Sequence, residues 1–162
     1  LDEENALAAL VYAERALERD PDLMLAQYVR GAALWVWRGD YANALADIDA
    51  VIGGILELTA FGVNYEPYLL RAQLHMSVED YDLALPDLQE AAMLRPDIPE
   101  VWRALGDLYL ATDRTEEMNT AYTEYVDISI SLGLAPDAEV LAILARSAVP
   151  EDNSSLEDAN DD

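Results

Sequence analysis

The chain has 162 residues, which is enough for one ordinary domain with a hydrophobic core of its own. Hydrophobic residues make up 52% of it, which excludes disorder over most of its length, and the absence of cysteine excludes disulfides and thiolate chemistry. With 33 acidic residues against 9 basic ones the net charge is −24, and such a surface repels nucleic-acid phosphates and anionic lipid head groups.

The acid excess has two interpretations. It could keep the protein soluble, for example in a salty environment, or it could attract a cationic partner. No apolar run approaches the ~18 residues of a membrane span, so no membrane insertion is expected. Leu1 is not an initiator methionine and no signal peptide begins there, so the chain is interpreted as a fragment or a processed product. The compartment stays open, although nothing in this chain points away from the cytoplasm.

Apolar residues recur at helical spacing along almost the whole chain. They predict helices at 3–19, 23–37, 41–52, 66–77, 81–94, 99–111, 115–131 and 137–148. Pro21 and Pro96 mark turns between helices, and Pro136-Asp137 is a start signal for the last helix. The first helix has no preceding partner, so either the chain begins inside a longer array, which we favour, or this helix packs differently.

Residues 52–64 form a longer connection than the others. Gly53-Gly54 could end the preceding helix, or the helix could continue to Leu58. The apolar residues of this connection either fold back over their own scaffold or form a docking loop for a partner; they are Ile55, Leu58, Phe61 and Val63. Pro86 lies inside a predicted helix and predicts a kink or a late helix start there.

Small residues return at a fixed interval. Ala72 and Gly106 are 34 positions apart, as are Ala84 and Met118. Ala44 precedes Ala84 by 40 positions, which is the same interval with a six-residue insertion. A constant interval of this length is typical of stacked helical repeats.

The segment VWRALGDLY, residues 101–109, contains Trp102, Leu105-Gly106 and Tyr109 in the order Trp-x-x-Leu-Gly-x-x-Tyr. In this the chain resembles the tetratricopeptide-repeat family, over roughly residues 1–127. The resemblance implies an all-α solenoid of antiparallel helix pairs, wound into a right-handed superhelix and closed by a C-terminal capping helix. The implied units are 1–22 (a second helix only), 23–64, 65–98, 99–132, the capping helix 133–150 and an acidic disordered tail 151–162.

The repeat explains the small residues, because two helices of one unit must cross closely. Five positions are expected at these crossings: Gly31, Ala72, Gly106, Ala44 and Ala84. A glycine in mid-helix costs ~1 kcal/mol relative to alanine, so a packing reason is needed for it. Met118 stands where sibling units have alanine, and it predicts looser packing in the last pair.

The residues do not favour an enzyme. The only histidine, His75, lies among apolar neighbours and is expected to be a packed residue, and no catalytic triad, zinc site or phosphate-binding glycine loop is visible. No cofactor and no metal are predicted. The acids of the tail lack the glycine of a calcium loop.

The favoured function is a scaffold or adaptor that binds a cationic or amphipathic segment of another protein. In the family, the first helices of the units line a concave groove. By position the groove residues would be Tyr28, Ala32, Trp35, Leu69, Gln73, Met76, Arg103, Asp107 and Leu110. Some members hold a carboxylate-terminated tail there with lysine, asparagine and arginine. This chain has no lysine, so that clamp is not expected.

The alternative is a structural subunit, or part of a larger repeat array, held by its exposed apolar helix and loop faces. In that case the protein would form an oligomer or a multi-subunit complex.

Overall fold

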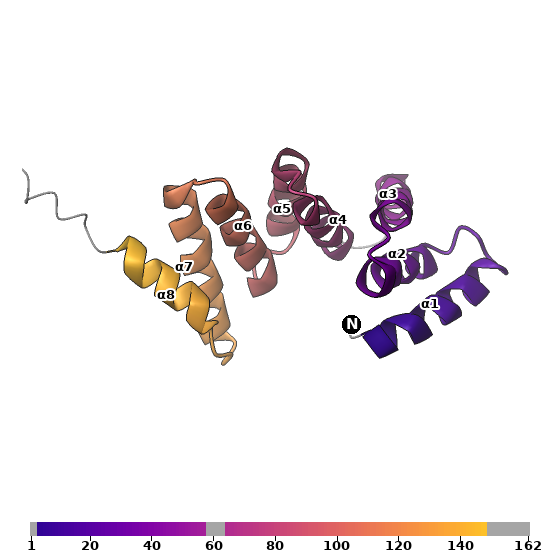
Figure 1. Cartoon of the computed structure of the whole chain (residues 1–162), viewed down its shortest axis with the longest axis horizontal. Coiled ribbons are helices and arrows are strands. Elements are labelled where there is room, and N and C mark those ends of the chain that lie inside the picture. The colour runs from indigo at the N-terminus through magenta and orange to yellow at the C-terminus, as the bar shows by residue number, and fades with distance from the viewer. Residues whose placement is uncertain (1–2, 58–63, 149–162) are drawn as a thin grey trace, which may run out of the picture.

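The computed structural model describes residues 3–57 and 64–148, and all regular structure within these ranges is helical. The helices are α1 (Glu3–Leu17), α2 (Met24–Arg38), α3 (Tyr41–Glu57), α4 (Glu66–Ser77), α5 (Tyr81–Leu94), α6 (Pro99–Ala111), α7 (Thr115–Ser131) and α8 (Ala138–Ser147). They follow one another along an arch, with α1 at one end and α8 at the other (Figure 1). The prediction of an all-α helical solenoid is confirmed.

The predicted bounds of α4, α5, α6 and α7 agree with the structure. At two positions the sequence left alternatives open, and the structure excludes one alternative at each. Gly53-Gly54 does not end α3, which continues to Glu57. Gly54 has a packing role instead, since a Cβ there would lie 2.8 Å from the sulfur of Met24 at the start of α2. The helix containing Pro86 does not start late, because α5 begins at Tyr81 and runs through the exposed proline with only one backbone donor missing.

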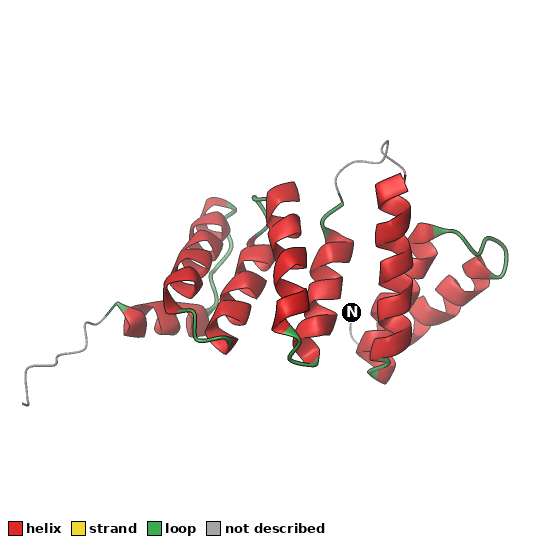
Figure 2. Ribbon diagram, turned by 90° about the horizontal axis from the view of Figure 1, so that it is seen from above, coloured by secondary structure: helices red, strands yellow, loops and turns green. Residues whose placement is uncertain are grey.

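Consecutive helices pack side by side as pairs, α2 with α3, α4 with α5 and α6 with α7 (Figure 2). The five small residues lie at these contacts, as predicted. Ala44, Ala72 and Ala84 are fully buried, and Gly31 and Gly106 are buried too. A Cβ on Gly31 would lie 3.1 Å from the carbonyl oxygen of Ala44, so α2 approaches the backbone of α3 as closely as glycine permits.

The packing of the last pair is not loose. Met118 is 3% exposed, and the ring of Tyr122 occupies the space that a side chain at position 106 would need. Gly106 thus leaves room for an aromatic ring of α7, whereas Gly31 leaves room for the close approach of the α3 backbone. The expectation of looser packing at Met118 was wrong because the bulk of the methionine lies in a third core cluster, together with Tyr122, Val140 and Ile143.

The turns inside the three pairs each contain a residue with positive φ. Gly39, Glu79 and Asp113, each at the end of a first helix, have φ values of 60°, 61° and 57°. In each turn the following residue donates its N–H to a carbonyl of the preceding helix, six residues back in the first turn (Asp40 to Leu34) and five residues back in the others, for example Asp80 to His75 at 2.9 Å. Only the first of these turns has the glycine that this conformation favours. The repeat is therefore more regular in the backbone than in the sequence.

The core consists of clusters strung along the arch. One joins α1, α2, α3 and α4, and the next joins α4, α5, α6 and α7. Each helix pair is thus buried against its neighbours, as expected for a solenoid. Two predicted features lie outside what the structure describes. They are the acidic tail 151–162 and the side chains of the candidate docking loop, namely Ile55, Leu58, Phe61 and Val63.

Candidate partner-binding groove

A cavity of about 370 Å³ lies between α2 and α4, the first helices of two consecutive pairs. Five predicted groove residues line it: Tyr28, Ala32 and Trp35 from α2, and Leu69 and Gln73 from α4. They come together because residues three, four and seven apart share one face of a helix. The structure thus brings one face of each helix to a common opening.

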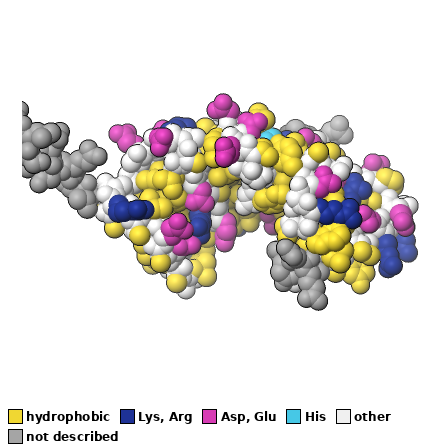
Figure 3. Space-filling view, in the orientation of Figure 1, with side chains coloured by type: hydrophobic (Ala, Val, Ile, Leu, Met, Phe, Trp, Pro, Cys, Tyr) yellow, Lys and Arg dark blue, Asp and Glu magenta, His cyan; other side chains and the backbone are white. Residues whose placement is uncertain are grey.

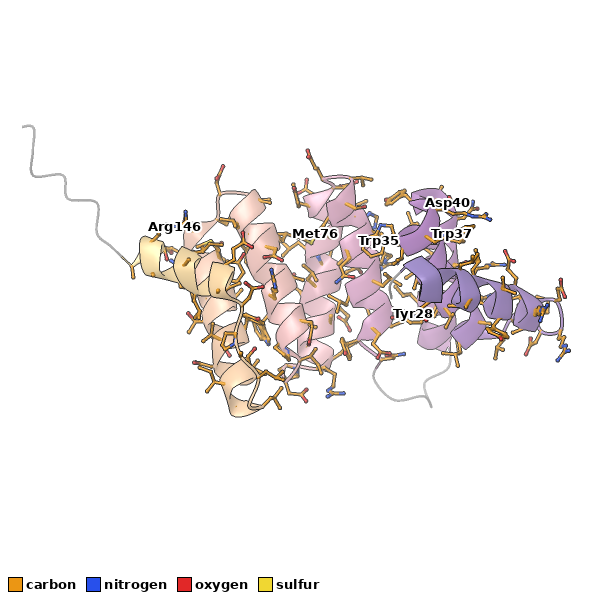
Figure 4. The ribbon with its side chains drawn as sticks, turned by 60° about the horizontal axis from the view of Figure 1, so that its bottom comes forward. Tyr28, Trp35, Trp37, Asp40, Met76 and Arg146 are labelled. Carbon is orange, nitrogen blue, oxygen red and sulfur yellow. The ribbon has the colours of Figure 1, made fainter. Side chains whose placement is uncertain are left out.

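Tyr28 and Trp35 are two turns apart on α2, and both are only partly buried. Figure 4 turns the underside of the arch forward and shows both side chains along α2. Each also packs against the core cluster of α1–α4. Trp37 does not line the cavity; it is 36% exposed, and the guanidinium of Arg38 lies 4.6 Å from its ring centroid.

The other predicted groove residues do not line this cavity. Met76 is half-buried and packs against the core cluster of α4–α7. Arg103 donates to Asp137 at 2.6 Å, and Asp107 accepts a hydrogen bond from the hydroxyl of Tyr122 at 2.7 Å. Leu110 is 45% exposed. The groove positions of α6 therefore serve contacts to α7 and to the start of α8, apart from the exposed Leu110.

Four lining residues were not predicted from the sequence: Val36, Tyr65, Glu66 and Leu70. Val36 and Leu70 each follow a predicted groove residue, so a wider helix face would have included them. Tyr65 is the N-cap of α4 and Glu66 is the first residue of that helix. Their proximity to Tyr28 depends on how α2 and α4 are placed against each other.

The cavity lies in a negative field. Burial raises the pKa of Tyr28 above its usual value, and the charge of Glu66 raises it further. The pKa of Tyr65 is raised by the same two causes in the same order. On the face shown in Figure 3, acidic side chains are scattered from one end of the described chain to the other. A negatively charged ligand is therefore disfavoured at this opening.

Arginine–aspartate pairs hold the helices that form the cavity. On α2, Arg30 binds both carboxylate oxygens of Asp47 on α3, at 2.8 and 2.6 Å. On α4, Arg71 binds Asp87 on α5 in the same way, with two contacts of 2.7 Å. Arg71 also reaches Asp49 on α3 at 2.8 Å and so connects the two pairs. These bidentate contacts fix the faces that Tyr28 and Leu69 present.

The single histidine of the sequence is part of the helix packing. His75 is 7% exposed, and its Nδ1 lies 3.1 Å from the hydroxyl of Tyr41, so the expectation of a packed histidine is confirmed. Within residues 3–57 and 64–148, no group of three His, Cys, Asp or Glu side chains is placed to hold a metal ion. In the same ranges no helix is both long and apolar enough to cross a bilayer.

Comparison with known proteins gives one family match. Residues 65–98 match the model of the tetratricopeptide repeat. No curated protein sequence matches the chain. Proteins with this repeat generally mediate protein–protein interaction and the assembly of complexes.

Several solved structures share the fold. YrrB, a tetratricopeptide-repeat protein with an unusual peptide-binding site, has a TM-score of 0.67 at 18% identity, over 89% of this chain and 68% of its own. TTC0263 of Thermus thermophilus, another such protein, has a TM-score of 0.65 at 19% identity over 85% and 70%. The Cut9–Hcn1 hetero-tetramer of APC/C has a TM-score of 0.75 at 17% identity, over 90% of this chain but 27% of the other.

The repeat match and the shared fold agree with the 34-residue interval and with the buried small residues at the helix crossings. Residues 65–98 therefore match a tetratricopeptide repeat, and the chain shares the fold of solved tetratricopeptide-repeat proteins.

Proposed function

We propose that this protein is an interaction scaffold, or adaptor, that binds a cationic or amphipathic segment of another protein along α2 and α4. The observation that carries the proposal is the cavity between α2 and α4, where Tyr28 and Trp35 keep part of their surface open beside Leu69. Aromatic side chains of this kind are frequent anchors in protein interfaces. The negative surface favours a cationic partner. The peptide-binding site of YrrB, which has the same fold, also supports the proposal.

Alanine substitution in the groove tests this function. Tyr28→Ala and Trp35→Ala are each expected to weaken binding of the partner about tenfold or more, because each removes an aromatic anchor. Trp37→Ala is the matched control, since this tryptophan is on the same helix but outside the cavity. Partners are captured from the native cell with each variant, and circular dichroism verifies that the variants are folded. Full capture by both groove variants would refute the groove.

We also propose the division of the chain into repeat units at 23–64, 65–98 and 99–132, with 1–22 as a partial unit and 133–150 as a capping helix. The equivalent turns at Gly39, Glu79 and Asp113 support this division, because each lies between the two helices of one unit.

A second candidate function, a structural subunit, is favoured by the outer surface of α8. Ala145 lies eight positions after the N-cap Asp137, as Gly106 lies eight positions after the N-cap Ile98. Gly106 is buried against α7, whereas Ala145 is exposed, next to the 44% exposed Leu141. The small residue of α8 is therefore at the surface, whereas the residue at the equivalent position of α6 is buried against α7. Leu7, Val11 and Tyr12 on α1 are also exposed.

Sedimentation velocity tests the second candidate. If α8 docks on another subunit, the protein should associate at high concentration, and Ala145→Arg should abolish association by placing a charge in the contact. Ala42→Arg, at an exposed position of α3, changes the net charge equally and should leave association intact. A wild-type protein that stays monomeric at high concentration excludes self-assembly.

A further inference from the structure

The cavity between α2 and α4 has an asymmetric lining. Ala32, Val36, Leu69 and Leu70 supply aliphatic surface, and Tyr28, Trp35 and Tyr65 supply aromatic rings. The one charged residue in the lining is Glu66, in the first turn of α4. The volume of the cavity, about 370 Å³, falls at the lower end of the range of about 300–1,000 Å³ for ligand pockets. An occupant would therefore meet apolar walls, ring faces and one carboxylate.

The carboxylate of Glu66 is available to an occupant. The side chain is exposed, and it forms no ion pair within the part of the chain that the structure describes. The better buried acids are already neutralised, as Asp47 is by Arg30 and Asp87 by Arg71. An incoming positive charge thus finds its counter-charge at Glu66 without breaking an existing pair.

One ring of the lining already faces a cation of the protein itself. The guanidinium of Arg95 lies 5.8 Å from the ring centroid of Tyr65, and it is held by Asp97 through contacts of 2.7 and 2.8 Å. This is the distance at which a cation is attracted to the face of an aromatic ring. Arg95 thus occupies one side of the ring, and its positive charge competes with any second cation at the opening.

We propose that this cavity binds an arginine side chain of the partner segment, with its guanidinium between the aromatic rings and the carboxylate of Glu66. Aliphatic walls suit the arginine stem, rings suit stacking of the planar head, and a carboxylate accepts two parallel hydrogen bonds from it. Lysine offers neither the planar face nor the bidentate geometry. This inference rests on the proposed function, because it names the residue that the groove recognises.

Three blocked tripeptides test the proposal: acetyl-Leu-Xaa-Leu-amide with arginine, citrulline or norleucine as Xaa. Citrulline keeps the shape of arginine without the charge, and norleucine keeps only an apolar stem. Binding to the full chain is followed by NMR, through the indole N–H of Trp35 and the backbone amides of residues 65–70. The arginine peptide is expected to bind about five- to tenfold tighter than the citrulline peptide.

Two variants assign the preference to the cavity. Glu66→Gln should remove the discrimination between the arginine and citrulline peptides, while Glu139→Gln, at the corresponding first turn of α8, should leave it unchanged. Arg95→Gln should tighten binding of the arginine peptide about two- to threefold, because it removes the competing cation from the face of Tyr65. A preference that survives Glu66→Gln would refute the role of the carboxylate.

The remaining outcomes separate this inference from the proposed function. If the norleucine peptide shifts Trp35 as strongly as the arginine peptide, the cavity is an apolar anchor site; the groove then stands and the arginine inference falls. If no peptide shifts Trp35 at about 10 mM, the arginine site is likewise overturned, since even a weak site of Kd near 1 mM would be largely filled. The groove is then decided separately by partner capture with Tyr28→Ala and Trp35→Ala.

Discussion

At the scale of single residues, glycine has two different roles in these helices. A Cβ on Gly106 would overlap the ring of Tyr122, whereas a Cβ on Gly53 would have no neighbouring atom within 4 Å. Both glycines are inside helices. The cost of placing a glycine inside a helix is therefore offset by packing at position 106, and no such contact is described for position 53.

Gly106→Ala is expected to destabilise the protein by about 1–3 kcal/mol, because the added methyl group forces Tyr122 out of its place. Gly53→Ala is expected to stabilise it by about 0.5–1 kcal/mol, because the unfolded chain loses freedom and nothing is displaced. Urea denaturation of both variants measures the free energy of unfolding. Equal effects of the same sign would contradict the close approach of α6 and α7.

The pair Arg71–Asp87 stabilises one carboxylate that has little access to solvent. Asp87 is 5% exposed, and Arg71 is its partner through two hydrogen bonds. Arg71→Met should cost about 3 kcal/mol in the free energy of unfolding, because it leaves a buried charge unpaired. The double variant Arg71→Met with Asp87→Leu should recover most of this loss. A double variant as unstable as the sum of the single ones would show that the residues act independently.

At the scale of elements, α8 depends on one residue at its start. Asp137 accepts the N–H of Glu139 at 2.9 Å and binds Arg103 of α6 at 2.6 Å. The hydrogen bond from Glu139 and then the guanidinium of Arg103 lower the pKa of Asp137 below its usual value of 3.8. One carboxylate therefore caps α8 and ties it to α6.

This lowered pKa makes the docking of α8 sensitive to acid. The contribution of Asp137 is complete above its ordinary pKa and is lost as the pH falls through the lowered value. The protection factors of the α8 amides, which compare their hydrogen exchange with that of an unstructured chain at the same pH, should therefore fall below about pH 4. Asp137→Asn keeps a capping side chain but does not titrate, so α8 should exchange faster than wild type near neutral pH, with less change on acidification. Identical pH profiles for both proteins would exclude Asp137 as the sensitive group.

At the scale of the whole molecule, the net charge of −24 acts on an elongated structure. Within the part of the chain that the structure describes, five of the nine arginines form ion pairs with acids, namely Arg30, Arg71, Arg95, Arg103 and Arg114. The remaining acids repel one another, and this repulsion opposes folding. Screening by salt should therefore stabilise the fold.

Raising NaCl from about 10 mM to about 150 mM should raise the Tm by a few degrees, because the Debye length falls from about 30 Å to about 8 Å. Differential scanning calorimetry measures the shift, and a neutral osmolyte at the same osmolality is the control. A Tm that stays constant or falls with salt would mean that ion pairs outweigh repulsion.

The candidate groove was predictable only in part. Tyr28 and Trp35 could be placed together from the sequence, because a separation of seven residues is two helical turns. The same reasoning grouped Arg103 and Asp107 with them, but α6 uses these side chains for Asp137 and Tyr122. Tyr65 and Glu66 were missed, because their place in the cavity depends on the position of α4 relative to α2.

The sequence by itself determined the helices, their 34-residue interval and the small residues at their crossings, because helical periodicity and steric size are local properties of a chain. Only the tertiary structure decided which carboxylates Arg30 and Arg71 bind, how Tyr122 fills the space beside Gly106, and which faces enclose the cavity. Those contacts join residues on different helices, for example Arg71 and Asp87, which are 16 positions apart. They depend on how far each helix is rotated and tilted against the next, which no spacing within a single helix encodes.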